Sequence, residues 1–375
     1  MMNFKLMARM KLITVCAEFR PHQQQYQSDM KIKNRFNLFR LPQLALVLTS
    51  VTAMGGEEMK APAPAPISTP DWLKVSGYAA ASYTYTDVQH GDSDESLFDA
   101  GTPLDAVKLG LEATQGDFSG YASLFYSPNT DANYFAGGSE AGILDAYVSY
   151  TAGAFKITGG KYLSYLGYEA FDTVNMTQLT YANSTTGGVP AYHTGIKVDY
   201  STDAWGAGFN ISDSIRGPSF WEGDADWGNG LGYEGYVVYK GIEKLTLWAG
   251  FAYDDTEDTA DFSSYDFWAS YDLTDKLTIA GEVIYADNTL SGANSAVGGL
   301  AFLKYSFTDK FSTVLRFGID EVESTGPTVT APDNYKYTIS PTYAFNEHFL
   351  VRGEVSYTDS DSDVFFGGVQ ALVKF

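Results

Sequence analysis

Charged side chains stand at regular places inside apolar stretches of this sequence. Arg316 lies in the run FSTVLRFGI, and Arg352 and Glu354 lie in FLVRGEVSY, where polar and apolar residues alternate. Charges spaced in this way have two uses. They pair with neighbours and stiffen a wall, or they line a narrow aqueous path and discriminate between solutes by their electric field. The residue types alone leave both uses open.

The alternation predicts which face of each strand carries these charges, because successive side chains on a strand point to opposite faces. In EKLTLWAGFAY, DKLTIAGEVIY, DKFSTVLRFGI and EHFLVRGEVSY, one face holds mainly Leu, Ile, Val, Phe and Tyr, and the other holds Thr, Ser, Glu and Arg. We expect the apolar face to meet lipid and the polar face to meet water, since a soluble barrel shows the reverse. The residues predicted to line the aqueous interior are Lys108, Glu112, Lys197, Glu282, Arg316, Arg352 and Glu354.

Some positions on the inward face are apolar, namely Trp248, Ile284, Phe302, Leu350 and Leu372. They indicate either a partly apolar interior, which would suit a sugar-like or amphipathic solute, or side chains packed at a barrel end or beneath an infolded loop. Packing beneath a loop is favoured, because small buried clusters are common under long loops.

These segments predict a transmembrane antiparallel up-and-down β-barrel of about sixteen strands between residues 72 and 375. Aromatic residues make up 15% of the chain, too many for a disordered protein, and no apolar run approaches the ~20 residues of a membrane helix. Seven short turns are predicted near residues 115–117, 151–154, 201–204, 240–244, 274–275, 308–309 and 346–347. Eight longer connections are predicted at about 87–103, 128–140, 164–190, 212–228, 255–261, 287–295, 321–333 and 359–363. The short turns would be periplasmic and the long loops external, with both termini in the periplasm.

The chain ends in the middle of an apolar strand, VFFGGVQALVKF, with Phe375 as its last residue. Termini fray unless they are tied into a sheet, so this strand needs a partner. In a closed barrel we expect it to pair with the first strand, near Val75 to Tyr85. That pairing would hold Phe375 at the periplasmic rim and turn Gln370 and Lys374 toward the interior.

The first 71 residues are expected to contribute no strand. A basic stretch from Met30, an apolar stretch and the small residues at 51–53 are typical of a secretory signal peptide, so we assign residues 30–53 to it and residues 1–29 to an upstream extension. Residues 54–71 are rich in Ala and Pro and predict a periplasmic linker. Without residues 1–53 the chain has 16 basic and 44 acidic residues, a formal charge of −28, which excludes nucleic acid as a partner.

The sequence from about Gly77 to Phe375 resembles bacterial outer-membrane porins, and more narrowly the OmpL-like β-barrel porin family. The resemblance rests on GGKYLSYLGYEAFDTVN and AYHTGIKVDY, and Phe375 resembles the C-terminal mark that the barrel-assembly machinery reads. It implies a water-filled channel for passive diffusion of small hydrophilic solutes across the cell outer membrane, in contact with lipid and lipopolysaccharide.

By analogy with general porins, the third external loop, about residues 164–190, would fold into the lumen. It would then place Glu169 and Asp172 in a constriction opposite Lys108, Arg316 and Arg352. The family also implies a homotrimer. Small residues on the lipid parity of the first strand, Gly77, Ala79 and Ala81, would allow a neighbour to approach closely.

Other function classes find weaker support. His193 lies on a predicted strand and could suggest an outer-membrane lipid hydrolase, but no nucleophile elbow or paired His accompanies it, so we expect a structural His and no enzyme. The acidic runs, such as residues 254–258, lack the spacing of a calcium loop and are expected to be solvated surface, so no metal or cofactor is predicted. A structural or adhesive barrel remains the main alternative to a pore.

Overall fold

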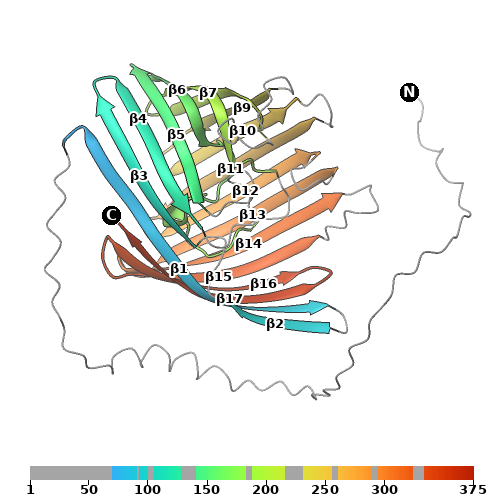
Figure 1. The fold of residues 1–375 in the computed structure, drawn as a ribbon. Coiled ribbons are helices and arrows are strands. Elements are labelled where there is room, and N and C mark those ends of the chain that lie inside the picture. Colours follow the sequence, from blue (N-terminus) through green and yellow to red (C-terminus); the bar gives the residue numbers. More distant parts are fainter. Residues whose placement is uncertain are drawn as a thin grey trace, which may run out of the picture. The chain divides into compact units, whose positions relative to one another are not determined.

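The computed structural model describes residues 70–90, 93–99, 105–127, 141–182, 188–215, 231–255, 261–288, 294–323 and 333–375. The strands among them form a closed antiparallel β-barrel of sixteen strands (Figure 1). The predicted fold class and strand number are therefore confirmed. The predicted extension (1–29) and signal peptide (30–53) lie outside the described residues, as does nearly all of the predicted linker. No helix in the described part of the chain is long and apolar enough to cross a membrane.

Each strand of the ring is antiparallel to the next in sequence. Its members are β1 (Leu73–His90), β3 (Ala106–Gln115), β4 (Phe118–Tyr126), β5 (Ala141–Ala152), β6 (Phe155–Leu163), β7 (Tyr192–Ser201), β8 (Trp205–Ser212), β9 (Gly232–Tyr239), β10 (Leu245–Asp254), β11 (Phe262–Thr274), β12 (Leu277–Asp287), β13 (Ser295–Ser306), β14 (Phe311–Glu323), β15 (Asn334–Ala344), β16 (Phe349–Asp359) and β17 (Asp363–Lys374). The seven predicted short turns join β3 to β4, β5 to β6 and so on to β15 and β16. Gly116 and Gly153 have a φ of 60° in the first two, a conformation that favours glycine.

One strand lies where the sequence analysis predicts only an external loop. β2 (Ser93–Asp99) pairs with the outer part of β1, from Thr84 opposite Asp99 to His90 opposite Ser93. The prediction of a loop over 87–103 is therefore wrong for most of its length. The β-branched residues Thr84, Thr86 and Val88 favour a strand, and the two residues between β1 and β2 in the sequence are Gly91 and Asp92, which suit hairpin turns.

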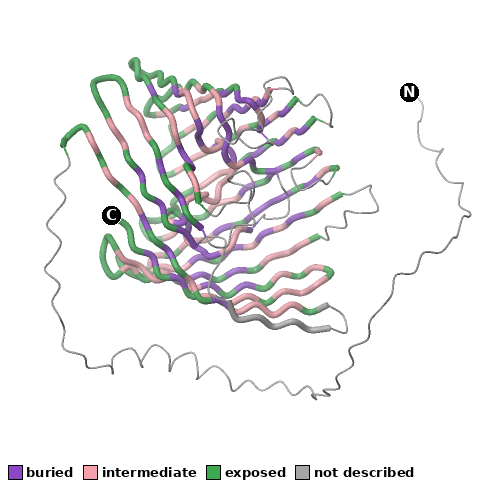
Figure 2. Tube along the Cα trace, viewed as in Figure 1, coloured by how far each residue is buried: buried purple, intermediate pink, exposed green. Residues whose placement is uncertain are grey.

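The two faces of the strands divide as the alternation predicts. Val283, Leu315 and Val355 are exposed on the outer face, and their neighbours in the chain, Glu282, Arg316 and Glu354, are buried. Figure 2 shows the same alternation of buried and exposed residues along the strands. The apolar outer face suits hydrocarbon, and the ring closure satisfies the backbone hydrogen bonds that lipid cannot satisfy.

The barrel closes where β17 pairs with β1, from Tyr78 opposite Lys374 to Gln89 opposite Asp363. Phe375 continues this pairing, because its N–H donates to Gly77 O at 3.0 Å and its O accepts from Gly77 N at 3.1 Å. A Cβ at Gly77 would lie 2.8 Å from Phe375 Cζ, so only glycine leaves room for this ring. Gln370 is buried inside, whereas Lys374 is exposed at the end of its strand.

Candidate functional site

Residues 164–182, which follow β6, lie inside the barrel; we call them the inner segment (Figure 1). Their sequence lacks the alternation of a strand, and Gly167 has a φ of 100°, which breaks an extended run. Their one regular element is the 3-10 turn η3 (Thr173–Asn175). Because few of the backbone groups of this segment pair with one another, they need partners from the wall.

Wall carboxylates hold the first part of the inner segment. Glu234 on β9 accepts hydrogen bonds from Ser164 Oγ at 2.6 Å and from the Tyr165 N–H at 3.2 Å. Asp266 on β11 accepts from the Gly167 N–H at 2.8 Å. Glu282 on β12 accepts from the N–H of the following residue, Tyr168. Carboxylates on β9, β11 and β12 thus accept hydrogen bonds from the N–H groups of Tyr165, Gly167 and Tyr168.

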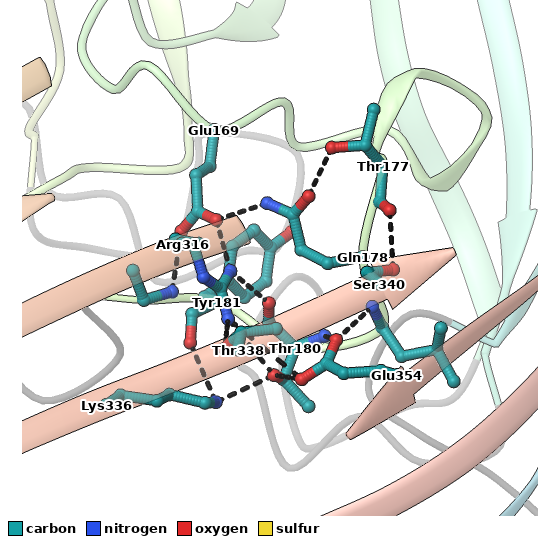
Figure 3. A network of polar contacts seen from close by, with 12 residues as sticks. Glu169, Thr177, Gln178, Thr180, Tyr181, Arg316, Lys336, Thr338, Ser340 and Glu354 are labelled. Atoms are coloured by element: carbon teal, nitrogen blue, oxygen red, sulfur yellow. Dashed lines mark hydrogen bonds and ion pairs between the residues drawn. The ribbon is translucent and has the colours of Figure 1, made fainter. Parts of the chain in front are cut away.

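Wall cations hold most of the second part, and Figure 3 shows two of them, Arg316 and Lys336. Arg352 on β16 donates from Nη2 to Thr173 O at 2.8 Å and from Nη1 to Met176 O. Arg316 on β14 donates to Thr180 O at 2.6 Å, and Lys336 on β15 donates to Tyr181 O at 3.0 Å. Wall cations therefore bind backbone carbonyls in the second part of the segment, whereas wall carboxylates bind backbone N–H groups in the first part.

Glu354 on β16 is the carboxylate of this second region (Figure 3). It accepts hydrogen bonds from the Leu179 N–H at 2.6 Å and the Thr180 N–H at 3.1 Å, and from the Thr180 hydroxyl. Its side chain is buried and lies 4.0 Å from Arg316 Nη2. A charged wall residue that accepts three bonds from one place on the segment fixes its position, because charge-assisted bonds are the strong ones.

Both predicted constriction residues contact wall cations. Glu169 forms an ion pair with Arg316, and its other oxygen accepts from the Ala182 N–H at 2.6 Å. Asp172 receives bonds from Lys108 Nζ at 3.0 Å to each carboxylate oxygen. The geometry therefore brings these predicted groups together as direct pairs. Their effect on ion selection stays a prediction.

The remaining predicted interior residues lie on the inner face in different settings. Arg352 lies among carbonyl oxygens, and the described structure gives it no carboxylate within 4.0 Å. Glu112 lies 3.8 Å from Lys74 in a pair exposed to solvent. Lys197 Nζ lies over the rings of Tyr162 and Tyr165, 4.5 and 4.8 Å from their centroids. The prediction of sites omitted Asp266 and Lys336, although both have the inward parity of their strands and parity could have found them.

Two of the five apolar residues of inward parity, Trp248 and Phe302, pack against the inner segment, as the sequence analysis favours. Leu166 joins a buried cluster with Trp248, and Tyr168 packs against a cluster that contains Phe302. Ile284 and Leu372 are fully buried, and Leu350 is half-buried. These contacts close part of the lumen with side chains.

A family model described as "Putative beta-barrel porin-2, OmpL-like" matches residues 72–371. The chain belongs to this porin family. No curated protein sequence matches the chain.

Solved structures share the fold of this porin. The outer membrane channel DcaP of Acinetobacter baumannii is 13% identical, with a TM-score of 0.61 over 81% of this chain and 97% of that one. The anion-selective porin from Comamonas acidovorans is 11% identical, with a TM-score of 0.61 over 81% and 99%. OmpT, an outer membrane protein of Vibrio cholerae, in its trimer form, is 15% identical, with a TM-score of 0.54 over 81% and 99%. Family and fold together make this chain an outer-membrane channel for passive diffusion of solutes.

His193 of the porin is a buried wall residue. Its Nε2 lies 3.3 Å from Glu234 Oε2 and 2.8 Å from Asn210 Nδ2. The Ser164 hydroxyl donates to Glu234 and not to the His193 imidazole. Ser164 and His193 therefore do not form the hydrogen bond between nucleophile and base that nucleophilic catalysis uses. The described residues contain no group of three or more His, Cys, Asp and Glu side chains that could hold a metal ion.

Proposed function

We propose that small hydrophilic solutes diffuse passively through a water-filled path beside the inner segment of this porin. One observation carries the proposal: an apolar outer face encloses an interior whose charged residues hold a folded-in segment at the middle of the barrel. We infer that the segment narrows the lumen and leaves a path beside it, which the charges of the wall keep polar.

Swelling of liposomes that contain the refolded porin tests this function with uncharged solutes of increasing size. We expect fast swelling in small polyols and sugars and a sharp fall in rate once the solute no longer fits. Liposomes that swell no faster than protein-free ones in the smallest polyol would show a sealed barrel, as a structural or adhesive protein requires.

The N-terminal assignments belong to the same proposal. We infer that residues 30–53 direct export and are removed, and that residues 54–71 form a periplasmic linker before the barrel. Phe375 would be read by the barrel-assembly machinery, and the exposed outer face would contact lipid and lipopolysaccharide. N-terminal sequencing of protein from outer membranes should give a start just after Ala53. An intact Met30 in the membrane-embedded protein would contradict the assignment.

We further propose that the porin is not an enzyme and that it assembles as a trimer. His193 supports the first point, since its contacts tie it to Glu234 and Asn210 in the wall. The second is supported by the fold shared with a trimeric outer membrane protein and by Ala79 and Ala81 on the exposed face of β1. The mass of the porin in detergent, corrected for bound detergent, should equal three chains, and a mass of one chain would refute the trimer.

A further inference from the structure

Aromatic rings run in an unbroken series along one side of the lumen. Neighbouring centroids are 4.6 Å apart between Tyr165 and Tyr236, and 6.0 Å apart between Tyr236 and Trp248. They are 5.9 Å apart between Trp248 and Trp268, and 5.4 Å apart between Trp268 and Tyr168. The aromatic arc is the set Tyr165, Tyr236, Trp248, Trp268, Tyr168 and Phe302, whose last ring lies 5.7 Å from Tyr168.

The middle of the arc is ordered by the sheet. Tyr236, Trp248 and Trp268 come from the adjacent strands β9, β10 and β11, and Trp248 and Trp268 are directly opposite in register. Their ring planes are nearly parallel, at 10° between the first two and 7° between the last two. Trp248 is buried against Leu166, whereas Tyr236 and Trp268 are only half-buried. Tyr236 and Trp268 are thus the arc residues of the wall that a solute can touch.

Hydroxyl groups lie next to the arc on its periplasmic side. Thr246 and Ser270 are opposite each other in register, one inward position beyond the pair of Trp248 and Trp268, and both are half-buried. Thr278 on β12 is also half-buried, and its hydroxyl bonds to the exposed Asp272. A solute against the arc would find hydroxyl donors and acceptors along one border.

Charged side chains near the arc determine which solute charge the arc favours. Asp199 is half-buried, accepts from Tyr165 Oη at 2.8 Å and lies 3.4 Å from Tyr236 Oη. Glu282 is directly opposite Trp268 in register, but it is buried and accepts from the Tyr168 N–H. Lys197 lies over the rings of Tyr162 and Tyr165, and Lys304 is directly opposite Thr278 in register. Carboxylates repel an anion and accept hydrogen bonds from hydroxyls, so the surroundings favour an uncharged solute with many hydroxyl groups.

We propose that the aromatic arc is a binding subsite for an uncharged sugar ring in the diffusion path. A pyranose has an apolar face of C–H bonds that can pack on the rings of Tyr236 and Trp268. Its hydroxyl groups can form hydrogen bonds with Ser270, Thr246 and Asp199. The inference rests on the proposed channel, because a sugar reaches the arc only through the lumen.

The test is block of the ionic current through single porin channels by cellobiose, a disaccharide of two uncharged rings. Sorbitol, an acyclic polyol at the same mass concentration, is the control for viscosity. The variants are Trp268→Ala, the conservative Trp268→Phe, and Tyr236→Leu. Tyr236 belongs to another strand of the arc, so Tyr236→Leu still tests the subsite if Trp268→Ala does not fold. Tyr147→Ala is the matched control, because Tyr147 on β5 also has the inward parity and is half-buried but lies outside the arc. Heat-dependent mobility in gels shows which variants fold.

We expect saturable block by cellobiose and none by sorbitol beyond its viscosity. Trp268→Ala and Tyr236→Leu should weaken the apparent affinity roughly three- to tenfold, and Trp268→Phe and Tyr147→Ala should stay near wild type. Equal block in wild type, Trp268→Ala and Tyr236→Leu, or block no greater than that by sorbitol, overturns the subsite while leaving the channel intact. A wild-type protein without KCl current overturns the channel and the subsite together.

Discussion

Arg352 shows at the scale of a residue what an interior charge does in this porin. Its guanidinium is buried and donates to the carbonyls of Thr173 and Met176 around the 3-10 turn of the inner segment. The sequence predicts it as a pore-lining charge and leaves open whether it acts on ions or stiffens the wall. We infer from its contacts that it positions the inner segment, because its donors are directed at the backbone of that segment.

Replacing Arg352 with Met should loosen the inner segment. The change removes the charge-assisted bonds to the carbonyls of Thr173 and Met176, each contributing about 1.5–3 kcal/mol. We expect larger and noisier single-channel currents with only a small change in the ratio of cation to anion permeability. Lys304→Met is the control, since Lys304 is an inward, half-buried lysine on β13 that is not among the described hydrogen-bond or ion-pair partners of the inner segment. Identical currents in Arg352→Met and wild type would show that Arg352 does not position the segment.

Glu169 and Asp172 raise the question of selectivity. Each is paired directly with a wall cation, Arg316 or Lys108, so neutralising the acids removes two negative charges beside these cations. Lys108 keeps its ion pair with Asp145, and Arg316 keeps Glu354 at 4.0 Å. The double variant Glu169→Gln with Asp172→Asn should therefore shift the reversal potential in a KCl gradient toward anions. Glu347→Gln, in an exposed turn, should leave it unchanged. An unshifted reversal potential in the double variant would refute a constriction that selects by charge.

At the scale of elements, the pairing of β17 with β1 closes the barrel. The sequence predicts their pairing from the apolar C-terminal strand alone, and the structure confirms it with the register displaced toward the outer end of β1. The sequence misses β2, since a short strand between turn-forming residues has the composition of a loop.

Gly77→Val should impair assembly of the barrel. A Cβ at this position would lie 2.6 Å from Lys108 O and 2.8 Å from the ring of Phe375, so the last residue could not keep its place. We expect a strong fall in the amount of heat-modifiable barrel in outer membranes, and deletion of Phe375 should act in the same way. Gly367→Ala is the control, because no atom lies within 4 Å of the added Cβ. Normal membrane levels of both Gly77→Val and the truncated chain would show that the contact between Gly77 and Phe375 is not needed for assembly.

The inner segment marks where prediction from the sequence stops. Its place inside the barrel followed from the resemblance, and the charges of the wall followed from parity. Which charge meets which backbone group did not follow, since Thr180 and Glu354 are 174 positions apart and their contact depends on the closed ring and the path of a segment without periodic structure. Period-two patterns fix faces of strands, whereas irregular backbone carries no such signal.

At the scale of the whole molecule, the porin is a ring with lipid-compatible residues outside and an anchored segment inside. Carboxylates of β9, β11 and β12 hold one part of that segment, and cations of β14, β15 and β16 hold much of the rest. The interior charges are thus largely engaged in shaping the path, and the space that they leave determines what passes.

The most direct measurement is the single-channel conductance of the porin in planar bilayers, for the wild type and for a variant in which a short Gly/Ser linker replaces residues 169–181. We predict discrete current steps in the wild type and larger steps of the same kind in the variant, because the segment narrows an existing path. Steps of equal size would show that the segment does not limit the path. A wild type without steps, in membranes where the barrel is fully inserted, would contradict the channel itself.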